Sequence, residues 1–207
     1  MRIAIISDIH GNWEGLKVVL QDIKLQSIDK VVCLGDLVEG GEHNDAVVEF
    51  IRENNIATVQ GNHDEFNDCQ LKQDNQKWLK ELPDLLIENN YIFTHISPRL
   101  KKCAISNSIE AWNVFDEVSF QVCFIGHIHF PALFGAQHDE FGEACSYFVD
   151  SGKFVLNTQD SYIVSFGAIG YSRGGGKFVR YGIFDAAENT VEFIKLEGPL
   201  LPYGLSI

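Results

Sequence analysis

Short apolar runs alternate with amphipathic segments over the first third of the chain, and this alternation restricts the fold more than any other feature. The runs Arg2–Ser7, Lys30–Leu34 and Ala57–Gln60 are typical of buried strands. Between them, apolar side chains at helical spacing predict one helix that begins after Asn12 and a second over His43–Asn54. Strand, helix, strand, helix, strand with short links predicts parallel strands joined by right-handed crossovers. The fold class is therefore α/β.

The rest of the chain is expected to be richer in strands. Helices are expected over Gln70–Leu82 and over Asn107–Val118, the second with Ile109, Trp112 and Phe115 on one side. Further strands are predicted at Leu85–Ile87, Tyr91–Thr94, Gln121–Ile125, Ala132–Gln137, Ala144–Val149, Lys153–Asn157, Tyr162–Phe166, Lys177–Phe184 and Thr190–Lys195. No repeat, low-complexity tract or linker marks a boundary, so we expect one domain over residues 1–207.

Composition indicates the class of partner and the compartment. Sixteen basic and 29 acidic side chains give a net charge of −13, which disfavours nucleic acid and anionic membranes and favours a small-molecule or protein partner. No window approaches the roughly 20 apolar residues of a membrane span, and the apolar run at residues 3–6 is too short for a signal peptide. The five cysteines form no CxxC pair and are expected to be reduced thiols, as in a cytoplasmic protein.

Side chains able to bind metal ions follow five of the predicted strands directly. They are Asp8 and His10, Asp36, Asn62, His95, and His127 with His129. The carboxyl ends of parallel strands in an α/β sheet meet at one crevice, so we expect these side chains to share one pocket. Each residue alone has a structural explanation as a helix cap, a turn residue or a hydrogen-bonded histidine. Five independent strand ends with the same chemistry favour a common site.

The donor set indicates a pair of transition-metal ions. Two aspartates, four histidines and one asparagine are too many ligands for one first-row ion but enough for two. Mixed oxygen and imidazole donors suit Mn²⁺, Fe or Zn²⁺ better than Ca²⁺. A carboxylate that bridges two cations about 3.5–4 Å apart forms the clamp used for in-line displacement at phosphorus.

These motifs carry a family resemblance. Five motifs in order, Asp8-Ile9-His10, Gly35-Asp36, Gly61-Asn62-His63-Asp64, His95 and Gly126-His127-Ile128-His129, resemble those of the calcineurin-like metallophosphoesterases. The stretches 7–12 and 94–99 are similar to those of small bacterial phosphodiesterase-type members, and residues 167–173 extend the resemblance faintly. The resemblance implies a four-layer α/β/β/α sandwich with two central mixed β-sheets.

The resemblance also implies a role for each metal-binding residue. Asp8, His10 and His129 would hold the first ion, Asn62, His95 and His127 the second, and Asp36 would bridge them. Two divalent ions are implied, with Mn²⁺ favoured and Fe, Zn²⁺ or Ni²⁺ as alternatives. A metal-bound hydroxide would attack a phosphate ester, foremost a phosphodiester of a small molecule.

The resemblance to the family also implies three candidate catalytic residues, His63, Glu39 and Asp64. His63 would face the substrate and donate a proton or a hydrogen bond. Glu39 occupies the place of an acid that orients this histidine in some members, although a solvated loop carboxylate is an equal alternative. Asp64 is expected to support the loop.

Arg99 and Arg173 are the cations best placed to bind a substrate phosphate, and each could equally form a surface salt bridge. Gly40 stands where phosphoprotein phosphatases of this family carry arginine, which disfavours a protein phosphatase. Ile96 replaces the glycine that usually follows the fourth-motif histidine.

Other functions stay open. A phosphomonoesterase or protein phosphatase is one alternative. The acid at Glu39, three residues after Asp36, suggests a dinucleoside-polyphosphate hydrolase as another. A nuclease is disfavoured by the lack of basic side chains, and a retromer-like scaffold by the complete ligand set. The tail at residues 200–203 could support a homo-oligomer.

Overall fold

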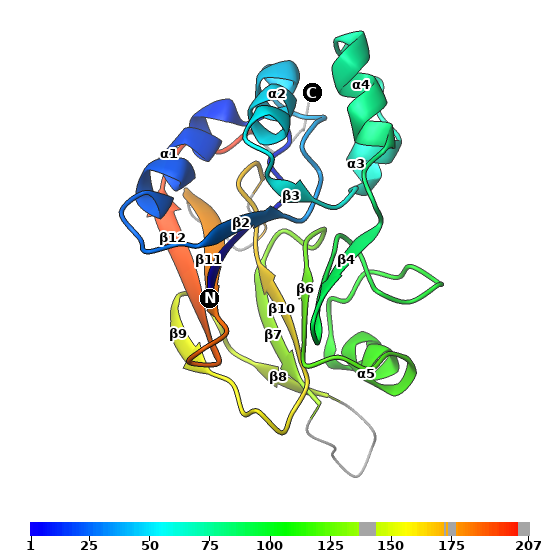
Figure 1. Cartoon of the computed structure of the whole chain (residues 1–207), viewed down its shortest axis with the longest axis vertical. Coiled ribbons are helices and arrows are strands. Elements are labelled where there is room, and N and C mark those ends of the chain that lie inside the picture. The colour runs from blue at the N-terminus through cyan, green and yellow to red at the C-terminus, as the bar shows by residue number, and fades with distance from the viewer. Residues whose placement is uncertain (137–143, 172, 174–176, 203–207) are drawn as a thin grey trace.

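The computed structural model describes residues 1–136, 144–171, 173 and 177–202. Within these residues twelve strands form two six-stranded mixed sheets (Figure 1). In spatial order, the first sheet contains β3 (Ala57–Thr58), β2 (Lys30–Cys33), β1 (Arg2–Ile6), β11 (Phe178–Asp185), β12 (Thr190–Glu197) and β9 (Gly152–Val155). The second contains β4 (Leu85–Glu88), β5 (Tyr91–Thr94), β6 (Val122–Ile125), β10 (Tyr162–Phe166), β7 (Pro131–Gly135) and β8 (Cys145–Tyr147).

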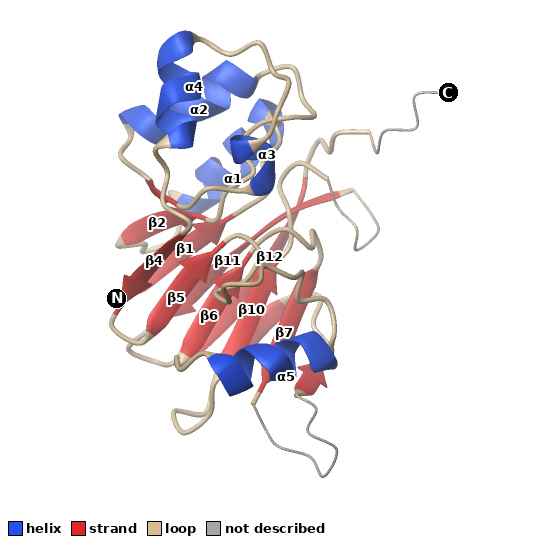
Figure 2. Ribbon diagram, turned by 90° about the vertical axis from the view of Figure 1, so that its right-hand side faces the viewer, coloured by secondary structure: helices blue, strands red, loops and turns tan. Residues whose placement is uncertain are grey.

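Helices cover the outer faces of the two sheets. The helices are α1 (Trp13–Ile23), α2 (Asn44–Glu53), α3 (Asn62–Glu65), α4 (Gln73–Lys80) and α5 (Ser108–Glu117). Residues of α1, α2 and α4 pack in one core cluster with the first sheet, and α5 packs in another with the second sheet. Figure 2 shows α5 lying across the second sheet, apart from the other four helices. The result is the predicted α/β/β/α sandwich.

Strand β1 explains why the N-terminal run is apolar throughout. Its side chains alternate, with Ile3 and Ile5 in the cluster between the sheets and Ala4 and Ile6 in the cluster beneath the helices. A strand buried on both faces needs apolar residues at every position. The same alternation holds for β6, where Val122 and Phe124 face the other sheet and Cys123 and Ile125 face α5.

The strand directions put five strand ends at one edge. Strands β1, β2 and β3 are mutually parallel, as predicted, and β5 and β6 are parallel in the second sheet. Strand β11 pairs antiparallel with β1, which makes the first sheet mixed. The loops after β1, β2, β3, β5 and β6 therefore carry the candidate ligands.

The elements predicted from sequence form with boundaries shifted by a few residues. Asn12 caps α1 as expected, accepting a hydrogen bond from the Gly15 amide at 3.1 Å. Of the three apolar residues expected on one side of α5, Trp112 and Phe115 pack against the core, whereas Ile109 is 57% exposed; Ala111 and Val114 are the buried residues of this helix. The short helix α3 was not predicted. The expected strand end at Gln137 and the tail residue Tyr203 lie outside the described residues.

Within the described part of the chain, none of the helices combines the length and the apolar character that crossing a membrane requires.

Candidate metal centre

Backbone hydrogen bonds draw the strand-end loops together. The Asp8 amide donates to the Gly35 carbonyl at 3.0 Å, and the His10 amide donates to the Asp36 carbonyl at 2.9 Å. The His127 amide donates to Asp8 Oδ1 at 3.0 Å, which links the first sheet to the second. The loops after β1, β2 and β6 thus meet at a common point.

Five of the candidate ligands adopt left-handed backbone conformations. Their φ angles are 53° for Asp8, 52° for His10, 54° for Asp36, 65° for His127 and 63° for His129. Residues with a Cβ rarely adopt this region, and each such conformation costs roughly 1–3 kcal/mol unless surrounding contacts enforce it. Strain is thus concentrated at the residues that the sequence singled out.

The first group of candidate ligands comprises Asp8, His10, Asp36 and His129, whose ligand atoms all lie within 4.8 Å of one another. His10 Nδ1 donates to the Glu39 carbonyl at 2.8 Å, so Nε2 carries the lone pair in the neutral ring. That Nε2 lies 3.3 Å from His129 Nε2 and 3.7 Å from Asp36 Oδ2. His129 Nε2 in turn lies 3.1 Å from Asp8 Oδ1.

The second group shares Asp36 and adds His95 and His127. His95 Nδ1 donates to the Leu34 carbonyl at 2.7 Å, which leaves Nε2 3.1 Å from Asp36 Oδ2 and 3.1 Å from Asn62 Oδ1. His127 Nδ1 also lies 2.9 Å from Asn62 Oδ1. Asn62, which follows β3, therefore completes this group with an amide oxygen.

The electrostatics of the two groups fit bound cations. Asp8 Oδ2 is buried without a hydrogen-bond partner, and the buried Asp36 Oδ2 faces the Nε2 atoms of His95 and His10. Such atoms are costly to bury unless a positive charge faces them. The neutral His95 ring turns its lone pair toward two oxygen acceptors, a contact that is repulsive unless a proton or a cation lies between. Residues of this type, without a thiolate among them, fit two divalent ions of the Mn²⁺, Fe or Zn²⁺ class.

The pKa values reflect the same crowding of charge. Burial raises the pKa of Asp8, but the hydrogen bond and the charge of His129 outweigh it and hold that pKa well below its usual range. Burial lowers the pKa of His95, but Asp36 overcomes this effect and raises the pKa to about 9. In the metal-free protein a proton therefore takes the position of a cation at His95.

His63 and Glu39 form a pair beside the two ligand groups. His63 Nδ1 lies 2.6 Å from Glu39 Oε2, and the His63 amide donates to Asp36 Oδ1 at 2.9 Å. The His63 ring centroid is 5.0 Å from that of His10. Both side chains line a cavity of about 290 Å³, together with His10, Asp36, Gly40, His127, His129, Tyr171 and Arg173. This contact favours the orienting role of Glu39 over a purely solvated carboxylate.

Asp64 stabilises the loops after β2 and β3 through buried hydrogen bonds. Its carboxylate accepts hydrogen bonds from the Asp36 and Leu37 amides at 2.8 Å and from the Gly61 amide at 2.9 Å. Burial raises its pKa to about 6, so the carboxylate is ionised at neutral pH. Asp64 is not among the residues that line the cavity. It thus supports Asp36, as expected, and has no direct contact with a substrate there.

The two candidate substrate-binding arginines lie in different surroundings. Arg173 lines the cavity at the metal centre. Arg99 donates two hydrogen bonds to Glu117, at 2.7 and 2.5 Å, and is not among the cavity residues. The structure therefore shows the salt-bridge alternative for Arg99 and does not bring it to the site.

Tyr171 is a site residue that the sequence did not reveal. Its ring centroid lies 5.0 Å from that of His10 and 6.2 Å from that of His129. A Cβ atom at Gly40, where φ is 146°, would overlap the Tyr171 hydroxyl. Tyr171 therefore fills the space that a side chain at position 40 would need. The only signal was an aromatic residue in the faintly similar stretch 167–173.

Two mixed sheets in an α/β/β/α sandwich, with aspartate and histidine clusters at the strand ends, define a metallophosphoesterase. The family model for calcineurin-like phosphoesterases matches residues 1–131. An uncharacterized protein of Methanocaldococcus jannaschii is 34% identical over 94% of this chain and 87% of its own length. The chain therefore belongs to the calcineurin-like phosphoesterase family, whose members hydrolyse phosphoesters with divalent metal ions.

Two more relatives refine this comparison. The crystal structure of a metallophosphoesterase from Sphaerobacter thermophilus is 29% identical, with a TM-score of 0.85 over 96% of this chain and 90% of that one. The symmetrical bis(5′-nucleosyl)-tetraphosphatase of Haemophilus ducreyi is 40% identical over 63 residues, which are 29% of this chain and 23% of that protein.

Proposed function

We propose that this protein is a phosphodiesterase that acts on small molecules and depends on two divalent metal ions. The observation that carries the proposal is the pair of ligand groups that share Asp36. Asp8, His10 and His129 would hold one ion, Asn62, His95 and His127 the other, with Asp36 between them. Bound ions at such a site lower the pKa of water and stabilise charge on the phosphoryl oxygens. Mn²⁺ is the first choice to test, because the donors are oxygen and imidazole.

His63 is the residue proposed to assist the leaving group. Its Nδ1 faces Glu39 at 2.6 Å, so Nε2 is the ring nitrogen that can reach a substrate. A protonated His63 donates from Nε2 to the departing oxygen while Glu39 stabilises the imidazolium. Arg173 lines the same cavity and supplies a cation for the phosphate.

The substrate is proposed to be a small molecule rather than nucleic acid, because a net charge of −13 repels long polyanions. Local positive charge at the centre would come from the metal ions and Arg173.

The test is turnover of bis(4-nitrophenyl) phosphate by metal-stripped protein supplied in turn with Mn²⁺, Fe²⁺, Zn²⁺ and Ni²⁺. We expect at least one ion to support turnover, Asp36→Asn to abolish it, and His63→Ala to lower kcat by about 10²–10⁴-fold. Asp74→Asn, an exposed aspartate in the first turn of α4, is the matched control. No turnover with any of the four ions contradicts the proposal.

A dinucleoside-polyphosphate hydrolase is the second candidate. Two observations favour it: the Glu39–His63 contact, and the 63-residue similarity to the Haemophilus ducreyi tetraphosphatase. Comparing kcat/KM for bis(4-nitrophenyl) phosphate, 4-nitrophenyl phosphate and diadenosine tetraphosphate separates a diesterase, a monoesterase and a polyphosphate hydrolase.

A non-catalytic scaffold is disfavoured because all seven proposed ligands and His63 are present. The proposal of a homo-oligomer is tested by sedimentation, in which a monomer at micromolar concentration excludes it.

A further inference from the structure

A second cavity opens directly beside the metal centre, and we call it the aromatic groove. It measures about 890 Å³ and is lined by Phe130, Pro131, Ser146, Tyr147, Phe148, Val149, Asp150, Arg173, Phe178, Arg180 and Lys195. Arg173 lines both this groove and the metal cavity. The groove also begins at Phe130, the residue after His129, and the Arg173 amide donates to the His129 carbonyl at 3.3 Å. The two cavities therefore share Arg173 and adjoin each other at residues 129–130.

The groove concentrates positive charge in an acidic protein. Of the described residues that line it, Arg173, Arg180 and Lys195 are basic and Asp150 is acidic. Asp150 Oδ1 accepts a hydrogen bond from Arg180 at 2.7 Å, and Lys195 pairs with the other oxygen. The Arg180 side chain is only 3% exposed, and its Nε is buried without a hydrogen-bond partner. Among the described residues, Asp150 thus balances only part of the combined charge of Arg180 and Lys195.

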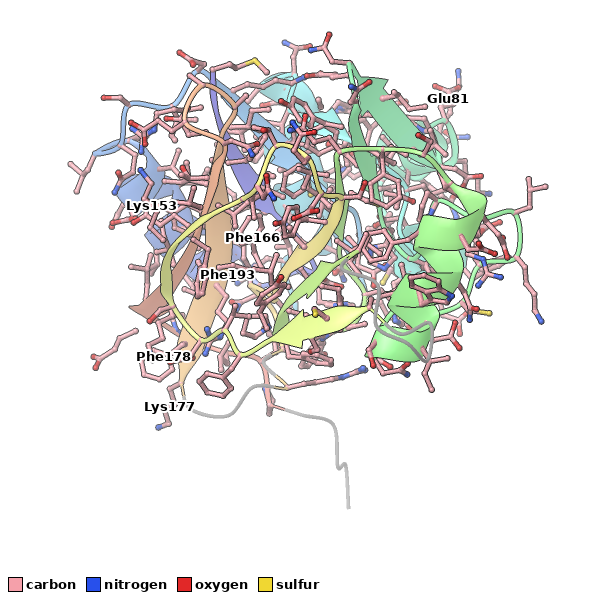
Figure 3. The ribbon with its side chains drawn as sticks, turned by 90° about the horizontal axis from the view of Figure 1, so that it is seen from below. Glu81, Lys153, Phe166, Lys177, Phe178 and Phe193 are labelled. Carbon is pink, nitrogen blue, oxygen red and sulfur yellow. The ribbon has the colours of Figure 1, made fainter. Side chains whose placement is uncertain are left out.

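Aromatic side chains form much of the remaining lining of the groove. Phe130, Tyr147, Phe148 and Phe178 all line it. Phe148 is 93% exposed, so its ring gains little of the hydrophobic stabilisation that a phenylalanine has in a core. Lys195 Nζ lies 5.1 Å from the centroid of the Phe178 ring. Figure 3 shows Phe178 at the rim of the molecule.

The opposite side of the metal cavity is unsuitable for an anion. The cavity that shares Glu39 with the metal site is also lined by Asp64, Glu65 and Asp68, with Lys80 as its cation. A phosphate ester that extends from the metals is repelled there and attracted toward Arg173.

The sizes of the cavities point in the same direction. The metal cavity of about 290 Å³ is at the lower limit of the range for small-molecule sites, whereas the groove of about 890 Å³ adds room for a larger substituent beside it. Base–aromatic stacking next to cationic side chains is the combination that binds nucleotides.

We propose that the aromatic groove binds the nucleoside part of the substrate, with a base against Phe148 and a phosphate near Arg173 and Lys195. The substrate class is then a nucleotide in phosphodiester or phosphoanhydride linkage. This inference rests on the proposed function for its catalytic consequence. Binding in the groove itself requires no metal ion.

Binding is tested on the metal-stripped full chain with a fluorescent N-methylanthraniloyl derivative of AMP, followed by anisotropy. We expect saturable binding that Phe148→Ala weakens about tenfold and Lys195→Met weakens severalfold. Competition by AMP should exceed that by adenosine or by inorganic phosphate, since each lacks one of the two recognised groups. Phe66→Ala removes another exposed phenylalanine, on the acidic side, and is the matched control.

Kinetics with two esters test the same groove in the metal-loaded protein. Thymidine 5′-(4-nitrophenyl phosphate) and methyl 4-nitrophenyl phosphate share a leaving group and differ only in the second ester group. We expect a higher kcat/KM for the thymidine ester, through KM, and a preference that Phe148→Ala reduces about tenfold.

The outcomes separate the two proposals. Absence of binding by the metal-free protein, or unchanged binding by Phe148→Ala, overturns the nucleotide groove whatever the activity. Binding of the AMP derivative without turnover of either ester supports the groove and overturns the proposed hydrolysis.

Discussion

At the scale of single residues, the metal centre depends on backbone conformations that its own side chains do not favour. Asp8, Asp36 and His129 hold left-handed φ angles because neighbouring groups enforce them. Asp64 is the clearest of these supports, since one carboxylate fixes three amides from two loops. A residue that does not itself bind a metal therefore helps to enforce the strained backbone conformation of one that does.

Asp64→Asn is expected to destabilise the protein by about 3 kcal/mol. Asparagine presents one acceptor oxygen and an NH₂ group, so at least one buried amide loses its partner and faces another donor. Urea unfolding of the metal-free protein measures this loss. Asp68→Asn, at an exposed position in the same loop, should leave the midpoint unchanged. Equal midpoints for the two variants would disprove the supporting role of Asp64.

The contact between Gly40 and Tyr171 predicts that a substitution at position 40 lowers activity and that a second substitution at Tyr171 partly restores it. A methyl group at position 40 overlaps the Tyr171 hydroxyl, so Gly40→Ala should displace this ring from His10 and lower kcat/KM. The positive φ of Gly40 adds a backbone cost of about 1 kcal/mol. Adding Tyr171→Phe removes the overlapping oxygen and should restore part of the lost activity. A double variant no better than Gly40→Ala alone would show that overlap with the hydroxyl is not the cause, because two ring carbons stay within 2.8 Å of the added methyl group.

At the scale of elements, two helices begin with an asparagine N-cap, and the two asparagines differ in the number of hydrogen bonds that they form. Asn107 accepts one hydrogen bond from the Glu110 amide at 3.0 Å, at an exposed helix start. Asn12 caps α1 and also donates to the Ile169 carbonyl at 2.9 Å and the Pro199 carbonyl at 2.7 Å. The second asparagine thus joins α1 to two distant segments of the chain.

Asn107→Ala is expected to cost about 1 kcal/mol of stability, the usual value for an N-cap. Asn12→Ala should cost about 3 kcal/mol, because the Ile169 and Pro199 carbonyls also lose their donor. Equilibrium unfolding of both variants measures the difference. Similar losses would mean that the contacts to Ile169 and Pro199 contribute little.

Sequence predicts these elements well where local signals are strong and less well where tertiary packing decides. The apolar run of β1 and the cap at Asn12 are local features, and both predictions are confirmed. Ile109 fits the helical stripe of α5 equally well, yet Ala111 and Val114 face the sheet, because the docking angle selects the buried face. The isolated helix α3 has no apolar stripe and gave no signal in the sequence.

At the scale of the whole molecule, the site could be predicted to the extent that it lies at strand ends. Parallel strands force Asp8, Asp36 and His127 to one edge whatever the details of packing. The pairing of Arg99 with Glu117, the place of Tyr171 and the aromatic groove depend on how separate strands and loops pack in three dimensions. No motif marks such contacts, so the sequence alone could not reveal them.

Removal of metal ions is expected to lower global stability. Without cations, Asp8 Oδ2 is buried without a hydrogen-bond partner, and Asp36 Oδ2 depends on a protonated His95. Mn²⁺ at about 100 times its Kd should raise the free energy of unfolding by about 2.7 kcal/mol per site. Urea melts with EDTA and with Mn²⁺ measure this shift, which Asp36→Asn should reduce strongly and Asp74→Asn should preserve. No shift with any divalent ion would contradict the assigned ligands.

Each proposed metal ion has ligands from both β-sheets. Asp8 and His10 follow a strand of the first sheet and His129 one of the second, while Asn62 belongs to the first and His95 and His127 to the second. A folding intermediate with only one sheet in place would hold at most a fragment of either coordination sphere. Tight binding of metal ions would then require both sheets to be packed together. A protein whose sheets are packed wrongly would bind metal ions weakly and would have no phosphoesterase activity.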